Sequence, residues 1–112
     1  MNTYQTQLRH KFLVGLIKGL KIVWPVLSAI LAAIVLLGVI VGQVEGWSIG
    51  DSIYFAFITA MTIGYGDFAP HTPLTKTLSV FIGLFGVLLT ALLAGLTVRA
   101  LTAALYREEE EE

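Results

Sequence analysis

Two long runs without a charged residue constrain the fold of this chain more than any other feature. The first extends from Ile22 to Val44 and the second from Thr77 to Val98. Each is longer than the roughly 20 apolar residues that a helix needs to cross the hydrocarbon core of a bilayer. The first run is too long and too far from the N-terminus for a signal peptide, and it has no clear small-residue cleavage site. We predict an all-α membrane protein of one domain with two spanning helices.

The composition agrees with this class and excludes several others. Of the 112 residues 56% are hydrophobic and 13% are charged, whereas about 25% of a soluble domain is charged. The absence of cysteine excludes disulfides and thiolate metal sites. No acidic or histidine cluster has metal-site or catalytic spacing, and no phosphate-binding glycine loop or nucleophile–base pair is present. We therefore expect neither an enzyme nor a nucleic-acid partner.

The distribution of basic residues predicts the orientation in the membrane. Four basic residues precede the first run and two follow the second: Arg9, Lys11, Lys18, Lys21, Arg99 and Arg107. Between the runs only Lys76 is basic. The positive-inside rule then places both termini in the cytoplasm and the central loop outside. We expect a multi-pass protein of the cell membrane.

A polar, glycine-containing hexamer lies between the two runs. It reads Thr62-Ile63-Gly64-Tyr65-Gly66-Asp67 (62–67) and resembles the selectivity filter of a potassium channel. In such a filter, four copies of one loop surround an axis, and rings of backbone carbonyls replace the water around a K⁺ ion. Gly64 and Gly66 take positive φ without penalty, which lets successive carbonyls point the same way. The resemblance implies K⁺ binding by the carbonyls of residues 62–65, with the Thr62 hydroxyl as the innermost ring and Gly66 as part of the filter.

A short helix is predicted just before the filter. Ser48 is a candidate N-cap and Asp51 follows three residues later, which is a helix-start signature. The helix from 49 to 62 is too short to span, so it must re-enter and end within protein. Its carboxyl end would then present partial negative charge to a cation. The resemblance implies that the side chains of Ile63 and Tyr65 pack against this pore helix.

The resemblance is to two-helix prokaryotic potassium channels and covers residues 22–106. It implies a homotetramer with a pore domain at 22–107, which comprises an outer helix at 22–44, the pore helix at 49–62, the filter at 62–67 and an inner helix at 74–106. It also implies passive K⁺ flow, with permeant K⁺ as the only ligand and no cofactor. Many relatives continue into a cytoplasmic ligand-sensing domain, so the abrupt acidic end indicates a pore module cut from a longer protein. We expect the small-xxx-small pair Gly38 and Gly42 to pack on the inner helix.

Three glycines interrupt the predicted inner helix. By count from Asp67, Gly86 matches the glycine that serves as the gating hinge in the family, while close helix packing is the alternative role. For Gly83 and Gly95 we expect packing. The positions that would face the cavity and the inner gate are one helix turn apart: Thr90, Ala94, Val98 and then Thr102.

The aspartate after the filter needs a hydrogen-bond partner. In the family Asp67 is held from behind the filter, in some relatives by a glutamate at the position of Ile58. Tyr54 remains as a hydroxyl donor. We hypothesise that filter inactivation depends on a Tyr54–Asp67 bond.

The two ends of the chain each have two interpretations. Residues 1–21 are either a basic amphipathic helix in the inner headgroup layer, where it would contact anionic lipids, or an extension of the first spanning helix. The acidic run 108–112 is either a solvated tail or a ring that concentrates cations at the inner mouth. His10 and His71 are either solvated or sensitive to pH.

Two other functions are weighed against a selective channel. A weakly selective cation channel would lose the tyrosine or the second glycine–aspartate element of the filter, and here Tyr65, Gly66 and Asp67 are intact. A non-conducting membrane anchor or regulatory subunit would not need Gly64 and Gly66 at these positions.

Overall fold

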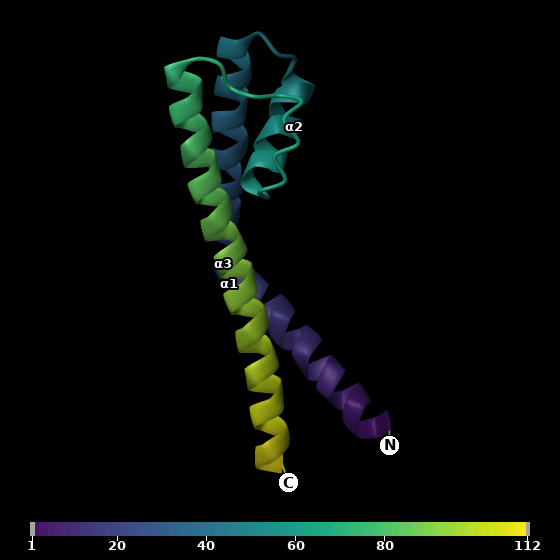
Figure 1. Cartoon of the computed structure of the whole chain (residues 1–112). Coiled ribbons are helices and arrows are strands. Elements are labelled where there is room, and N and C mark those ends of the chain that lie inside the picture. Colours follow the sequence, from purple (N-terminus) through teal and green to yellow (C-terminus); the bar gives the residue numbers. More distant parts are fainter. Residues whose placement is uncertain (1, 112) are drawn as a thin grey trace. The chain divides into compact units, whose positions relative to one another are not determined.

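The computed structural model describes residues 2–111, with side chains for residues 3–106, and confirms the all-helical fold class. Three helices follow one another: α1 at Asn2–Glu45, α2 at Ile49–Ala60 and α3 at Pro73–Glu111. No strand occurs among the described residues. Figure 1 labels α2, the short element that lies between the two long helices in chain order.

The long helices are membrane helices by length and by exposure. At 1.5 Å per residue the 44 residues of α1 measure about 66 Å and the 39 of α3 about 58 Å, well beyond the bilayer core. Only 33% of the most apolar stretch of α1 and 11% of that of α3 are buried within the chain. The core helix of a soluble protein would bury most of such a stretch. Two long apolar helices with so little cover within the chain fit a membrane protein.

The first helix does not begin at the apolar run. It is continuous from Asn2 through the segment 1–21, so that this segment extends the spanning helix instead of forming a separate element; residue 1 lies outside the described residues. Pro25 therefore lies in the interior of α1. A proline there cannot donate a bond to the carbonyl four residues earlier, which permits a bend.

The other bounds also differ slightly from those expected. The pore helix ends at Ala60, two residues early, because the backbone turns at the C-cap Met61 before the filter. The last helix starts at Pro73 and continues through Glu111, over most of the acidic run 108–112, whose final residue lies outside the described residues. Pro73 suits a first helical position because its missing N–H has no intrahelical acceptor there.

The chain divides into two compact units. One combines Met1–Val26 with Ala91–Glu112, and the other is Leu27–Thr90. In the first unit, Gly15 of α1 lies against Ala100 of α3, where an added Cβ would be 3.7 Å from the alanine Cβ. Ala100 and Ala104 are buried there.

In the second unit α2 contacts parts of both long helices, α1 on one side and α3 through Gly86, whose nearest neighbour is the Ala60 backbone. Gly38 and Gly42 of α1 pack on Ala56 and Ser52 of α2, with so little room that an added Cβ would overlap these side chains. The prediction that these two glycines pack on the inner helix was therefore wrong, because within the chain they pack on α2. The small residues of α2 stand four apart, as the glycines do, so that the two helices approach closely along matching faces.

Candidate selectivity filter

The filter segment begins at the carboxyl end of α2, whose start is set by a local cap. Ser48 has extended backbone dihedrals, and its Oγ accepts a hydrogen bond of 3.1 Å from the Asp51 N–H, as its sequence position predicts. The Ser52 hydroxyl also donates to the Ser48 carbonyl at 2.7 Å. These bonds fix where α2 starts, and twelve helical residues later the chain turns into the filter.

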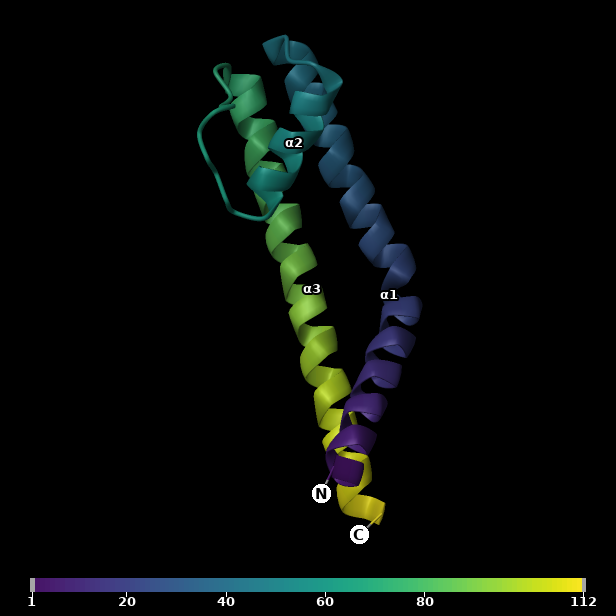
Figure 2. The same ribbon diagram turned by 90° about the vertical axis from the view of Figure 1, so that its right-hand side faces the viewer.

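Backbone hydrogen bonds attach the first filter residues to the last turn of α2. The N–H groups of Ile63 and Gly64 both donate to the Ile58 carbonyl, at 2.8 and 3.2 Å. The Thr62 N–H donates to the Thr59 carbonyl at 3.2 Å. Figure 2 shows the chain leaving the end of α2 and continuing as a loop to the start of α3. The partial negative charge of the helix end and the filter are therefore held next to each other.

The sign of φ alternates along the filter. It is 58° at Thr62, 59° at Gly64 and 86° at Gly66, while Ile63 and Tyr65 between them are not positive. In a strand with φ of one sign, successive carbonyls point to opposite sides. Alternation between left-handed and right-handed backbone turns successive peptide planes the same way, so that their carbonyls face one direction. Such a row of oxygens can replace the hydration shell of a cation.

Sequence reasoning missed the positive φ of Thr62. A residue with a Cβ is disfavoured there by about 1–2 kcal/mol, so composition gives no signal for it. The Thr62 hydroxyl donates to the Met61 carbonyl at 2.6 Å. The conformation continues the alternation to the first residue of the filter.

The side chains of Ile63 and Tyr65 have little cover within their own chain. Ile63 is 44% exposed and Tyr65 is 70% exposed. Packing of Tyr65 on the pore helix, which the sequence led us to expect, is therefore largely absent within one chain.

The structure brings Tyr54 and Asp67 together behind the filter. The Tyr54 hydroxyl donates to the Asp67 carboxylate at 2.9 Å, and the Phe68 N–H donates to the other carboxylate oxygen at 3.1 Å. The bond to Asp67 raises the pKa of Tyr54, with contributions from desolvation and from the negative charge nearby. Ile58, at the glutamate position of some relatives, is buried.

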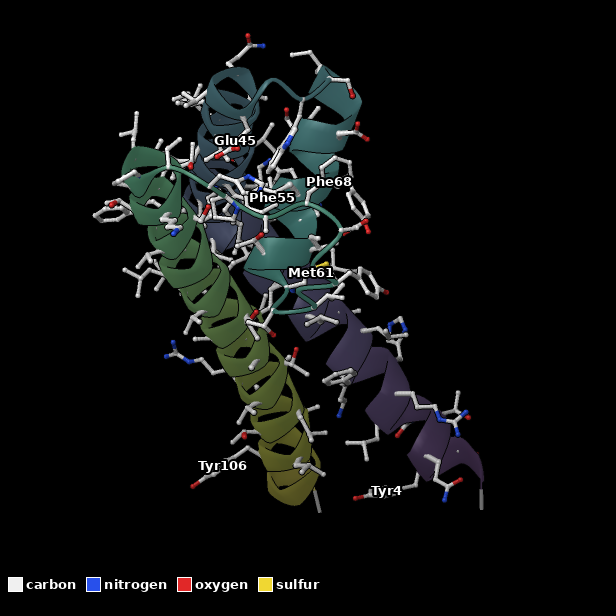
Figure 3. All side chains as sticks on the ribbon, turned by 45° about the horizontal axis from the view of Figure 1, so that its top comes forward. Tyr4, Glu45, Phe55, Met61, Phe68 and Tyr106 are labelled. Carbon is white, nitrogen blue, oxygen red and sulfur yellow. The ribbon has the colours of Figure 1, made fainter. Side chains whose placement is uncertain are left out.

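An aromatic cluster that sequence reasoning missed surrounds this pair. The Trp47 ring lies edge-on to Phe55 at 5.0 Å and to Phe68 at 5.2 Å, and Tyr54 contacts Phe68 at 6.0 Å. Figure 3 labels Phe55 and Phe68 beside α2, with Met61 at its carboxyl end. Edge-to-face pairs of this kind favour one arrangement of the rings, which holds the residue after Asp67 in place.

A second tie joins the end of α1 to the loop after the filter. The Glu45 carboxylate accepts from the His71 N–H at 2.7 Å and from the Thr75 hydroxyl at 2.8 Å, and it lies 3.0 Å from Nδ1 of His71. The Glu45 side chain is 6% exposed and that of His71 is 77% exposed. Sequence reasoning did not identify Glu45, because its partners lie 26 and 30 residues away.

The predicted gate residues lie on α3 but have different surroundings. A Cβ on Gly86 would overlap the Ala60 backbone, whereas Gly83 and Gly95 meet nothing within 4 Å in the chain. Packing within the chain therefore explains Gly86 and not the other two. Three predicted cavity positions, four residues apart, are all exposed: Thr90, Ala94 and Val98.

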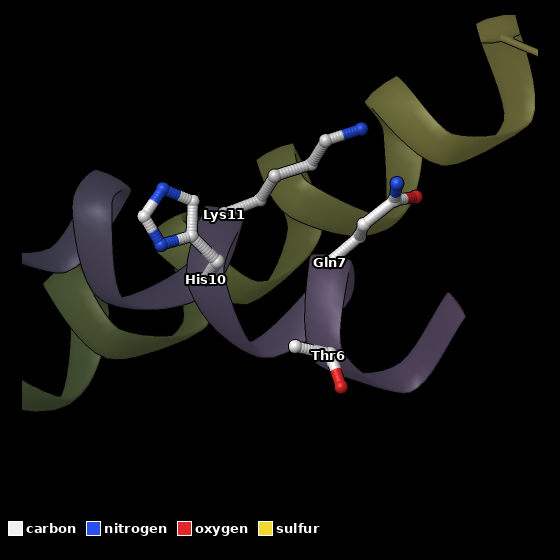
Figure 4. Close-up of a pocket in the computed structure, with 4 residues that line it drawn as sticks. All are labelled: Thr6, Gln7, His10 and Lys11. Atoms are coloured by element: carbon white, nitrogen blue, oxygen red, sulfur yellow. The ribbon is translucent and has the colours of Figure 1, made fainter. Parts of the chain in front are cut away.

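A polar hollow on α1 includes His10. Thr6, Gln7, His10 and Lys11 line about 430 Å³ (Figure 4). These four described lining residues all come from α1. In the part of the chain that the structure describes, no three His, Cys, Asp or Glu residues gather to hold a metal.

The fold and the filter together define the pore domain of an ion channel. The family described as "Ion channel" matches residues 23–103, and the chain belongs to this family. It is a family of channels and not of enzymes.

Several relatives carry the name of potassium channels. Over 85 residues the chain is 33% identical to the putative potassium channel protein YugO of Bacillus subtilis, covering 69% of this chain and 26% of that protein. It is 35% identical over 63 residues to a voltage-gated potassium channel of Aeropyrum pernix, and the match covers 56% of this chain and 21% of that protein. It is 45% identical over 56 residues to potassium channel protein 1 of Methanocaldococcus jannaschii, and the match covers 50% of this chain and 16% of that protein. The chain thus spans about a quarter of these relatives' length or less, and no solved structure matches it significantly.

Proposed function

We propose that this chain forms a potassium-selective channel that conducts K⁺ passively through the carbonyls of residues 62–65, with Gly66 completing the filter. The observation that supports it most is the alternating φ of Thr62, Gly64 and Gly66 beside the carboxyl end of α2. The relatives named as potassium channels support the same ion. Permeant K⁺ is the only ligand proposed, without a cofactor.

The conducting form is proposed to be a homotetramer. One filter segment can line an ion on one side only, and four copies around an axis would enclose the ion. The exposure of Ile63 and Tyr65 supports this assembly, since both side chains would gain cover from neighbours. Gly86 is proposed as the hinge of the inner helix, and Thr90, Ala94 and Val98 as the wall of the cavity and inner gate.

The proposed location is the cell membrane, with both termini in the cytoplasm. The support is the excess of basic residues before Ile22 and after Val98. Anionic lipids are proposed partners of the basic stretch that precedes Ile22, since Lys18 and Lys21 are exposed within about two turns of the apolar run.

Ion flux from liposomes that contain the purified chain tests the function. Potassium flux that barium blocks, with little sodium flux, is expected. Equal potassium and sodium fluxes would favour a weakly selective cation channel with the same fold. If the chains form no tetramer and no ion flux is measured, the result would favour a non-conducting membrane anchor or regulatory subunit.

A further inference from the structure

The inner ends of α1 and α3 are joined by a seam of close contacts within one compact unit. An added Cβ on Gly15 of α1 would be 3.7 Å from the Ala100 Cβ of α3. One on Gly19, a helix turn further on, would overlap the end of the Leu96 side chain. The two contacts advance by four residues in opposite directions, so the helices run antiparallel in a defined register. We call these four residues the inner seam.

The two glycines of the inner seam have different roles. At Gly15 a Cβ would make an ordinary van der Waals contact, and a hollow of about 70 Å³ remains beside this glycine, lined on α3 by Ala100, Ala103 and Ala104. At Gly19 the missing side chain makes the space that Leu96 occupies. Gly19 is therefore the position where the contact depends on the absence of a side chain, and Gly15 is the position where a side chain fits.

The inner seam and the proposed gate lie on opposite sides of α3. The side of α3 that α1 covers repeats every four residues and is half-buried or buried: Leu96, Ala100 and Ala104. The gate positions expected from the sequence are offset from these by two residues and are all exposed: Ala94, Val98 and Thr102. Two residues correspond to about 200° around a helix. The inner segment of α1 therefore contacts α3 from behind the gate positions.

The gate side of α3 has a physical reason to close. It carries apolar side chains, and Val98 is 64% exposed within the chain. Around a water-filled axis, four copies of Val98 would lower their free energy by leaving water and meeting one another. An apolar constriction of this kind closes a pore by dewetting it. A helix that is held from behind resists such a movement, and the inner seam provides this hold.

We infer that the inner segment of α1 braces α3 against closure of the gate, with Gly19 as the positioning residue that seats Leu96. The inference rests on the proposed channel function and extends it to the segment that precedes Ile22. Fastening the inner seam leaves the channel able to open. Loosening the seam lets α3 move toward the axis, so the open state becomes less populated while the filter is unchanged.

The first experiment fastens the inner seam with a disulfide. The chain has no cysteine, and the 3.7 Å between the Cβ positions of residues 15 and 100 is within the range of about 3.5–4.5 Å that a disulfide needs. Gly15→Cys with Ala100→Cys should form a bond within one chain, seen on a non-reducing gel. Single-channel recordings in planar bilayers should then show the same open probability before and after reduction, or a higher one before it. A bond between chains, or an opening that appears only after reduction, would overturn the inference.

Gly19→Val tests the positioning residue itself. Its branched side chain would displace Leu96, so the open probability should fall about tenfold, an effect in the range of overpacking at one contact. The single-channel conductance and the preference for K⁺ over Na⁺ should stay the same. Leu96→Ala in the same chain should restore part of the open probability, because it removes the overlapping atoms. Leu13→Val, at an exposed position of α1, is the matched control. An unchanged open probability in Gly19→Val would contradict the brace.

Spin-label distances provide a readout that does not require conduction. Thr102→Cys gives one label in each copy, because the chain has no other cysteine. The distances between copies should shorten when Gly19→Val is added and stay the same when Leu13→Val is added. Equal distances with and without Gly19→Val would refute the brace even if ions flow. Shortening in a tetramer that carries no potassium current would support the brace and count against the channel function.

Discussion

Gly86 of α3 lies directly against the backbone of Ala60, the last residue of α2, so closely that a Cβ on Gly86 would overlap the Ala60 carbonyl. The filter begins two residues after Ala60. The turn of α3 that contains Gly86 therefore supports the end of α2 to which the filter is bound. A movement of α3 at Gly86 would displace the end of α2 and with it the start of the filter. This contact therefore couples the proposed hinge to the proposed site of selectivity.

This contact predicts the effect of adding one methyl group. Gly86→Ala should lower the free energy of unfolding by about 1–3 kcal/mol per chain, because overpacking against backbone cannot be relieved by a side-chain rotation. Thermal or denaturant unfolding of the purified chain in detergent micelles measures this change. Gly83→Ala, where nothing lies within 4 Å in the chain, is the matched control. If Gly86 acted only as a hinge, its substitution would alter channel opening and leave the stability unchanged.

Removal of the Tyr54 hydroxyl should affect the lifetime of the conducting filter. Tyr54→Phe loses the 2.9 Å bond to Asp67, and current decay should become a few-fold faster while the preference for K⁺ over Na⁺ stays the same. Tyr106→Phe, at an exposed position of α3, is the control. Unchanged decay in Tyr54→Phe would contradict a role for this bond in inactivation.

The same bond predicts a response to alkaline pH. The bond to Asp67 raises the pKa of Tyr54 above its usual value of 10.0. A raised pKa means that the protonated hydroxyl is the stabilised form, so its contribution is complete below pH 10 and is lost as the pH rises further. Tyr54→Phe should reduce the difference in stability between pH 9 and pH 11, measured by thermal dissociation against the Tyr106→Phe control.

The alternating backbone of the filter predicts that glycine is required at position 64. Gly64→Ala would place a Cβ at a φ of 59°, at a cost of about 1–2 kcal/mol per chain. The filter would then relax toward negative φ and turn a carbonyl away from the axis, so the ratio of potassium to sodium flux should fall. Gly50→Ala, within α2 and without the positive φ or a near neighbour, should keep the ratio.

The close approach of α1 to α2 predicts a coupled pair of substitutions. Gly42→Ala should lower the free energy of unfolding by about 1–3 kcal/mol, because its Cβ would overlap the Ser52 side chain. Ser52→Gly removes that side chain and should restore part of the stability in the double variant. A double-mutant cycle with no coupling energy would show that the two positions do not share this contact.

The sequence by itself determined the features that depend on local composition and spacing. Two uncharged runs required two apolar helices, because a bilayer accepts only segments whose backbone is bonded internally. Ser48 marked the start of α2, because a cap acts within three residues. The hexamer 62–67 marked the segment with the unusual backbone, since Gly64 and Gly66 are the residue type that takes positive φ readily.

Only the tertiary structure decided which surfaces meet. The sequence could not assign Gly38 and Gly42 to α2, because a small-residue face fits any helix with a similar face. It could not identify Glu45, whose partners follow from the return of the loop to the end of α1. The positive φ of Thr62 is imposed by the bonds that hold the filter under α2, against the preference of a residue with a Cβ. Contacts between distant segments depend on the fold as a whole, whereas caps, runs and glycines act within a few residues.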